Sequence, residues 1–341
     1  MTGNTIIHIG ILDKFIPSFV DVIQKEYNND EHHFYFAGNQ DSYSINEKAY
    51  FTHLHSLRQL AEKRDELLAA DKIILHGIFS KDIYWLLSEN PELLPKTYWM
   101  IWGGDLYKAI EQKNNSDIET KIRNKILHNI GHCITYIHAD YLLYKKEFNC
   151  NPQLHECFMY MSNIYTDIKL HKQNSPTKTI LLGNAATPTN HHMESFQILE
   201  KYKEQDIRII TPLSYGDKEY GWQIAKAGKE IFGDTFVPLW DFLPIHAYKR
   251  LLNDVDIALF NHSRQQAMGN TITLLGLGKK VYIRKNTGVW DTLTNMGIQV
   301  FDVEHFNIDI NESLEKNAKR VRECFSYKTY LRQLEKIFTH H

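Results

Sequence analysis

The segment DIALFNHSRQQAMGNTITLLGLGKKVYI, residues 256–283, is the most informative part of this 341-residue chain. An apolar strand ends in the polar loop 261–266, and a helix opens at Gly269, Asn270 and Thr271 before a second strand at 280–284. This order is typical of a parallel sheet with crossover helices. The free N–H groups of a helix N-terminus favour anions, so we expect this turn to hold a diphosphate.

The same alternation of strands and amphipathic helices runs along the whole chain, and the polar stretch 171–178 divides it in two. We expect an α/β protein of two doubly wound, Rossmann-like domains that face a central cleft, at 1–170 and 171–310. The remaining residues, 311–341, are expected to form a helix that crosses back to the first domain. The other expected strands span 5–11, 33–37, 72–76, 98–102, 133–138, 179–182, 207–212, 235–239 and 255–260.

Composition excludes several classes of protein. A net charge of −2 argues against nucleic-acid binding, and no apolar run reaches the ~18 residues of a membrane-spanning helix. The N-terminus lacks the basic region of a signal peptide, which favours a cytoplasmic protein. Four cysteines without a CxxC pair indicate reduced thiols.

We expect no metal site, because Asp254 and Asp256 precede a strand and therefore face away from the cleft.

Polar residues after the strands of the second half form the candidate donor site. The guanidinium of Arg264 can clamp a diphosphate and neutralise the charge on the leaving group; the alternative is an exposed arginine in a solvated turn. Asn184 and Asn190 flank a strand-to-helix turn where amides could meet phosphate, although both are also ordinary turn and cap residues. Tyr215, which follows a strand, is expected against the base or the sugar.

Two residues of the first half are candidate catalytic groups. Asp105 follows a strand and the glycine turn at Gly103, so it could orient an acceptor hydroxyl or act as general base. The alternative is a helix N-cap. His76 ends another strand and is the second candidate, with a core histidine as the alternative. Lysines and arginines between 121 and 146 lie beside an apolar helical face, which indicates either an ordinary packed helix or a membrane contact.

Beyond these local patterns, residues 256–283 resemble the donor site of GT-B glycosyltransferases, in which a strand, a polar loop, a glycine and a helix hold a sugar nucleotide. Many members carry a glutamate on that helix for the ribose hydroxyls, and this place falls at Thr273 here. A deoxyribose lacks the 2′-hydroxyl, so the resemblance implies a dTDP-sugar donor.

Several motifs together resemble the TDP-N-acetylfucosamine:lipid II N-acetylfucosaminyltransferase family of enterobacterial common antigen synthesis. The resemblance implies a GT-B fold, a dTDP-linked 4-acetamido-4,6-dideoxygalactose donor and an undecaprenyl-diphosphate-linked acceptor. Departures at 185–189, at Ala267 and Met268, and at Asn270 leave the donor sugar open. The motifs are Trp102, Gly103, Gly104 and Asp105; His76 and Gly77; Gly183 and Asn184 with Asn190 and His191; Pro212 with Tyr215; and Arg264, Gln265 and Gln266 followed by Gly269.

The sequence therefore predicts a glycosyltransferase, without cofactor, that moves a sugar from a nucleotide to a lipid-linked acceptor at the inner face of a bacterial inner membrane. Donor binding is expected on the second domain and acceptor binding on the first. Whether the anomeric configuration is retained or inverted stays open. The alternatives are a non-catalytic nucleotide- or carbohydrate-binding subunit and a GT-B-like sugar-nucleotide epimerase.

Overall fold

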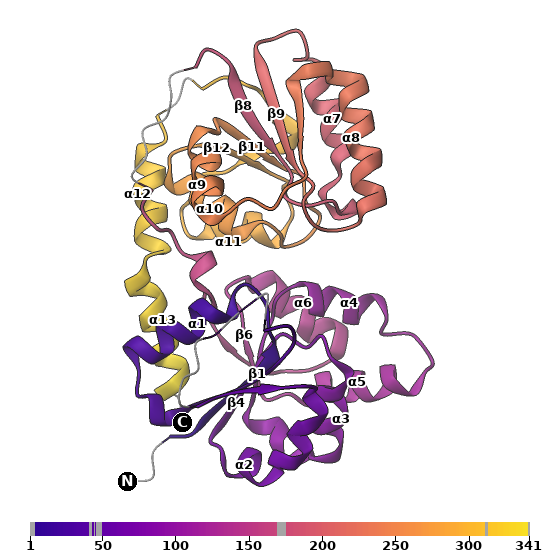
Figure 1. Ribbon diagram of the computed structural model, residues 1–341, viewed down its shortest axis with the longest axis vertical. Helices are drawn as coiled ribbons and strands as arrows, with labels where there is room; N and C mark the ends of the chain where they lie inside the picture. Colours follow the sequence, from indigo (N-terminus) through magenta and orange to yellow (C-terminus); the bar gives the residue numbers. More distant parts are fainter. Residues whose placement is uncertain are drawn as a thin grey trace. The chain divides into compact units, whose positions relative to one another are not determined.

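A computed structural model describes residues 4–40, 43, 45, 50–168, 175–310 and 313–339 (Figure 1). The chain forms two compact units, Met1–Ser162 with Tyr330–His341, and Asn163–Thr329. The division falls ahead of the expected linker, of which residues 171–174 lie outside the described ranges.

The first unit contains a seven-stranded parallel sheet in the order β3-β2-β1-β4-β5-β6-β7. Most residues of its strands are buried because helices cover both faces. The core on one face takes side chains from α3 and α5, and Phe19 of α1 and Phe338 of α13 pack on the other. The strands are β1 Ile6–Ile11, β2 His32–Ala37, β3 Phe51–Leu54, β4 Lys72–His76, β5 Thr97–Met100, β6 His132–Ile134 and β7 Gln153–His155; the helices are α1 Ile16–Glu26, α2 Arg64–Ala69, α3 Lys81–Glu89, α4 Gly104–Glu111, α5 Ile118–Asn129, α6 His138–Phe148 and α13 Tyr327–Thr339.

The second unit has a six-stranded parallel sheet in the order β10-β9-β8-β11-β12-β13. In Figure 1, α7 and α8 lie on one side of this sheet and α9 and α10 on the other. The strands are β8 Lys178–Leu182, β9 Ile207–Pro212, β10 Phe236–Leu239, β11 Ile257–Phe260, β12 Lys280–Ile283 and β13 Phe301–Asp302; the helices are α7 His192–Glu200, α8 Lys218–Phe232, α9 Ile245–Asp254, α10 Met268–Gly276, α11 Gly288–Asn295 and α12 Glu315–Cys324.

The structure differs from the sequence-based expectation in three places. The leucine spacing of residues 54–69 predicts one amphipathic helix, but these residues form the end of strand β3, a 3-10 turn at Leu57–Lys63 and α2, because Ser56 and Gln59 form a capping box that starts a new element. The C-terminal helix is two helices, interrupted at Phe325 and Ser326. Strands β3, β7 and β13 were not expected; each is short and lies at a sheet edge, where the apolar signal is weakest.

Each sheet reverses its strand order once, between β1 and β4 in the first and between β8 and β11 in the second. Doubly wound sheets bind ligands at the carboxyl ends of the strands at such a reversal. These two places therefore position the candidate sites. No helix in the described ranges is long and apolar enough to cross a membrane.

Candidate functional site

The turn after β8 brings polar groups to the reversal point of the second sheet. Gly183 has φ +65°, and a Cβ at this residue would lie 2.7 Å from Asn190 Oδ1 and 2.9 Å from His192 Nε2. Only glycine fits both the backbone conformation and this space. The turn therefore packs directly against the residues that begin α7.

Asn190 ties this turn to the loop after β11. Its Oδ1 accepts the backbone N–H of Asn184 and the ring Nε2–H of His262, each at 2.9 Å, and its amide donates to Thr187 Oγ1 at 2.7 Å. The residue is fully buried. Because its side-chain polar atoms are engaged within the protein, Asn190 shapes the turn, which is the role that the sequence left open beside a contact of backbone amides with phosphate.

His262 was missed by sequence reasoning, which treated 261–266 as a polar loop. Burial is the main cause that lowers the pKa of His262 to about 3, and the neighbouring His192, Arg264 and His191 act in the same direction. Its neutral ring donates to Asn190, so it is a structural link between β8 and β11.

Asn184 and Tyr215 lie together at the same edge. The amide of Asn184 donates to the hydroxyl of Tyr215 at 2.7 Å, and Tyr215 remains 45% exposed. Behind them, Ala186 donates its N–H to the carbonyl of Tyr215 at 2.8 Å. Gly216 fits here because a Cβ would lie 2.4 Å from Ala186 O. The ends of β8 and β9 therefore hold Tyr215 at the rim.

The loop between β11 and α10 places Arg264 and Gln266 around a small cavity, which Thr271 also lines. Gln266 donates to Thr187 Oγ1 at 3.4 Å, and Gln265 lies next to it, partly buried. Ala267 caps α10 with φ +54°, a left-handed conformation that costs a non-glycine residue roughly 1–2 kcal/mol.

The first turns of α10 carry the other expected donor residues. Gly269 and Thr271 lie in the first turn, and among the described residues no side chain caps this helix end. The amide of Asn270 donates to the hydroxyl of Tyr248 in α9 at 2.7 Å, so Asn270 links α10 to α9. Thr273 is partly buried further along α10.

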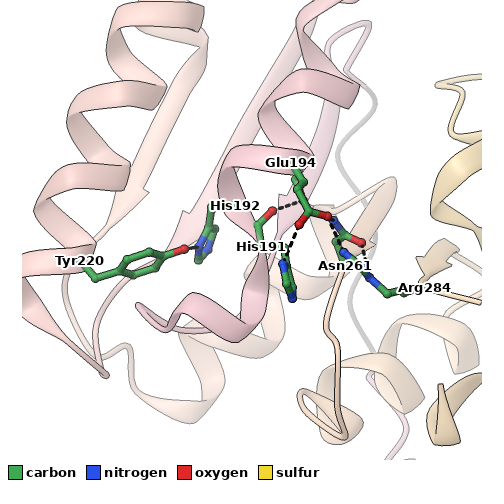
Figure 2. Close-up of polar contacts among 7 residues, drawn as sticks. His191, His192, Glu194, Tyr220, Asn261 and Arg284 are labelled. Carbon is green, nitrogen blue, oxygen red and sulfur yellow. Dashed lines mark hydrogen bonds and ion pairs between the residues drawn. The ribbon is translucent and has the colours of Figure 1, made fainter.

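A second cluster at the start of α7 escaped sequence reasoning (Figure 2). Glu194 accepts from Arg284 Nη2 at 2.5 Å and contacts His191 Nδ1 at 2.8 Å. Asn261 donates to the same carboxylate at 3.3 Å and accepts from Arg284 Nε at 3.0 Å. Burial raises the pKa of Glu194, but its hydrogen bond to Arg284 and the charge of that residue outweigh burial, and the net shift is downward.

Unsatisfied polar atoms gather around this edge. Within the described ranges, five buried atoms of the turns after β8 and β11 lack a hydrogen-bond partner. Buried polar atoms are normally paired, and each unpaired atom in a native protein calls for an explanation such as a ligand. The atoms are Asn184 Oδ1, His191 Nε2, His192 Nε2, Gln265 Oε1 and Gln266 Oε1.

In the first unit, His76 is not a free catalytic group. Its ring lies between His8, at 3.1 Å, and the hydroxyl of Tyr160, at 2.8 Å, and only 1% of the residue is exposed. Burial lowers the pKa of His76 to about 3. The geometry favours the core histidine, which was the alternative to a catalytic role.

Asp105 follows β5 and the glycine turn, as the sequence predicted, and its side chain is buried. The carboxylate is 3% exposed, and its two oxygens accept four hydrogen bonds of 2.8–3.0 Å. The donors are the indole of Trp99 and the backbone N–H groups of Ile78, Trp102 and Leu106. A carboxylate with every lone pair directed at a fixed donor organises the turns after β4 and β5, and this geometry does not favour a general base.

The aspartates near β11 lie as expected for structural residues. Asp254 ends α9, and Asp256 accepts the backbone N–H of Thr179 at 3.0 Å at the amino end of the strand. Within the described part of the chain, no group of three or more His, Cys, Asp or Glu side chains is placed to hold a metal ion. In α5, Ile126 and Leu127 are buried in the first core, whereas Lys121 and Lys125 are exposed.

The backbone is similar to several solved glycosyltransferase structures. Anabaena HepE in complex with UDP has a TM-score of 0.70 at 10% identity, over 99% of this chain and 100% of that chain. Sucrose-phosphate synthase from Thermosynechococcus elongatus has a TM-score of 0.68 at 12% identity, over 98% of both chains. The apo structure of OtsA has a TM-score of 0.64 at 8% identity, over 99% of both. The fold is therefore GT-B, as the sequence predicted.

A family profile covers most of the sequence. Residues 10–331 match the 4-alpha-L-fucosyltransferase family, glycosyl transferase group 56. This match includes every strand except the first four residues of β1, and every candidate residue described above. The chain is a glycosyltransferase with the GT-B fold, and it belongs to the 4-alpha-L-fucosyltransferase family, glycosyl transferase group 56.

Proposed function

We propose that this glycosyltransferase takes a 4-acetamido-4,6-dideoxygalactose-type sugar from dTDP and adds it to an undecaprenyl-diphosphate-linked saccharide in bacterial surface glycan synthesis. The observation that carries the donor half is Arg264 in the loop that leads to the uncapped N-terminus of α10, together with the unpaired ring nitrogens His191 Nε2 and His192 Nε2. A helix N-terminus, an arginine and ring N–H donors suit a diphosphate. The Anabaena relative was solved with UDP, which also supports a nucleotide ligand.

The choice of thymidine rests on Thr273. A glutamate at this place in related enzymes would hold the ribose hydroxyls, and threonine cannot reach them as a carboxylate does. Because deoxyribose has one hydroxyl fewer, the threonine should cost a dTDP-sugar enzyme less than a UDP-sugar enzyme. We therefore expect the enzyme to distinguish dTDP-sugars from UDP-sugars by the nucleotide.

A thermal-shift panel of dTDP, UDP, GDP and ADP tests the donor. At 100 times its dissociation constant, a ligand stabilises the folded protein by about 2.7 kcal/mol, so the preferred nucleotide should stand out. We expect dTDP to give the largest rise in melting temperature. In Thr273→Glu, the difference between the rises that dTDP and UDP give should be smaller. An equal response of the wild type to UDP would rule out the dTDP assignment.

The acceptor and the membrane location need a separate test. The second unit exposes Trp222, Phe242 and Ile245, and α5 exposes Lys121 and Lys125. Aromatic rings favour the headgroup level, and each cation near an anionic surface contributes about 1 kcal/mol. We expect co-sedimentation with anionic vesicles and transfer of labelled sugar into an organic extract. A nucleotide-binding subunit or an epimerase would not label the extract.

A further inference from the structure

A chain of charged contacts ends at His191 (Figure 2). Arg284 holds one oxygen of Glu194, and the other oxygen contacts His191 Nδ1 at 2.8 Å. Asn261 bridges Arg284 and Glu194 through both atoms of its amide, which fixes the orientation of the carboxylate. A carboxylate that accepts Nδ1–H sets the tautomer of the ring and leaves Nε2 as the nitrogen that acts.

Nε2 of His191 is buried and lacks a hydrogen-bond partner in the described part of the chain. A buried polar atom in that state costs roughly 1–3 kcal/mol, so its retention suggests a ligand contact. The next residue gives a second, independent indication, because His192 is fully buried and its Nε2 also lacks a partner among the described residues. Both nitrogens lie at the N-terminus of α7, where anions are favoured.

The ion pair between Glu194 and Arg284 contributes too little to folding stability to explain this cluster. The side chains of Glu194 and Arg284 are 53% and 33% exposed, and an ion pair in such a setting contributes about 0–1 kcal/mol. The titratable neighbours of His191 are Glu194 and His192 from α7 and His262 from the β11–α10 loop, and Arg284 is reached through Glu194. Glu194 is the carboxylate in contact with the ring, and it orients the ring through Nδ1.

We propose that His191, positioned by Glu194 and Arg284, donates its Nε2–H to the departing diphosphate of the sugar nucleotide. This inference rests on the proposed function. When the bond from the sugar anomeric carbon to the diphosphate oxygen breaks, the electron pair stays on that oxygen, and the His191 cation stabilises it. The acceptor oxygen bonds to the anomeric carbon, and the hydroxyl proton passes to water. His191 is a catalytic residue in this scheme, whereas Glu194 and Arg284 are positioning residues.

Calorimetric binding of dTDP and UDP tests the proposal, because both carry the diphosphate. His305 supplies a matched control: it lies in the same unit, is exposed, and its Nδ1 also faces a carboxylate, that of Asp302. We expect His191→Gln to weaken binding of both nucleotides at least ~10-fold and His305→Gln to leave it unchanged. His191→Asn suits the left-handed backbone at this residue, with φ 51°, and gives a second variant if glutamine perturbs folding.

The pH dependence separates a proton-holding role from a structural one. Over roughly pH 6 to 9, wild-type affinity should fall on the alkaline side as the imidazolium is lost, and His191→Gln should lack this decline. Glu194→Gln retains the imidazole and should therefore keep the decline. The proposal is overturned if His191→Gln binds like His305→Gln or keeps the alkaline decline. If the wild type binds neither dTDP nor UDP, the proposed diphosphate site itself fails, and this inference fails with it.

Discussion

Nε2 of His76 lies 3.1 Å from Nδ1 of His8, and this contact belongs to a buried chain of hydrogen bonds that runs from Trp102 to His32. The indole of Trp102 can only donate, so it gives its proton to the oxygen of Tyr160. Tyr160 then donates to His76, His76 to His8, and His8 to His32. Because His76 is the acceptor that the buried Tyr160 O–H requires, this direction satisfies every proton of the chain and gives one neutral tautomer for all three histidines.

This chain makes the protein sensitive to acid. Burial lowers the pKa of His76 to about 3 and that of His32 to about 4, and it lowers the pKa of His8 as well. Because these folded-state pKa values lie below the unfolded value of about 6.5, their contribution to stability is complete above that pH and is lost as pH falls towards 4. At pH 5, His76 and His32 should each reduce the free energy of unfolding by about 2 kcal/mol.

Urea unfolding at two pH values measures this effect. The midpoint at pH 5 should lie well below that at pH 7.5, with little change between pH 7.5 and 8.5. His192 and His262 in the second unit, with pKa values lowered to about 4 and about 3 mainly by burial, should add to the loss. Equal midpoints at pH 5 and 7.5 would show that the histidines are accessible to protons in the folded state.

Asp105→Asn should destabilise the first unit and leave dTDP binding intact. All four partners of the carboxylate are N–H donors, so the new amide NH2 would face two of them and leave both unsatisfied. The expected cost is roughly 2–6 kcal/mol at about 1–3 kcal/mol per unsatisfied group. Asp65→Asn, at an exposed aspartate of α2, is the control. A variant as stable as the control but slower in transfer would restore Asp105 as a general base.

Local patterns in the sequence predicted the parts of the site that lie in one short stretch. The strand, loop and helix from Ile257 to Gly276 contain Arg264 and the start of α10, and periodicity with a glycine sufficed to place them. The His191 cluster could not be found in this way, because Arg284 and Glu194 are 90 residues apart. Only the order of the strands brings such residues together.

In the first unit, sequence patterns gave the positions of the candidate residues but not their burial. Sequence patterns placed Asp105 and His76 after strands, which is where the structure has them, yet gave no measure of burial. The partners that bury them are distant or aromatic: Tyr160 for His76 and the Trp99 indole for Asp105. A polar residue at the carboxyl end of a strand serves equally well as a catalytic group or as the anchor of a turn.

Arg264→Ala should lower turnover at least ~100-fold without unfolding the protein, because a charged donor to the transition state is lost. Arg264 is partly buried beside the cavity of the β11–α10 loop. Arg208, exposed on β9, provides the matched alanine control. The measurement is the turnover number of both variants at saturating donor. Near-normal turnover of Arg264→Ala would show that Arg264 does not bind the diphosphate.

Transfer should persist in excess EDTA. The Asp254 and Asp256 pair resembles a metal-binding motif, but Asp256 is committed to the N–H of Thr179 at the amino end of β11, opposite the edge where Arg264 lies. A cation held there could not reach a diphosphate at the carboxyl end of the strand. We expect Arg264, the N-terminus of α10 and His191 to balance the charge of the leaving group. The measurement is sugar transfer with and without EDTA, with added magnesium or manganese as the reversal control. Activity that disappears in EDTA and returns with either metal would contradict the metal-free scheme and require a cation ligated outside this pair.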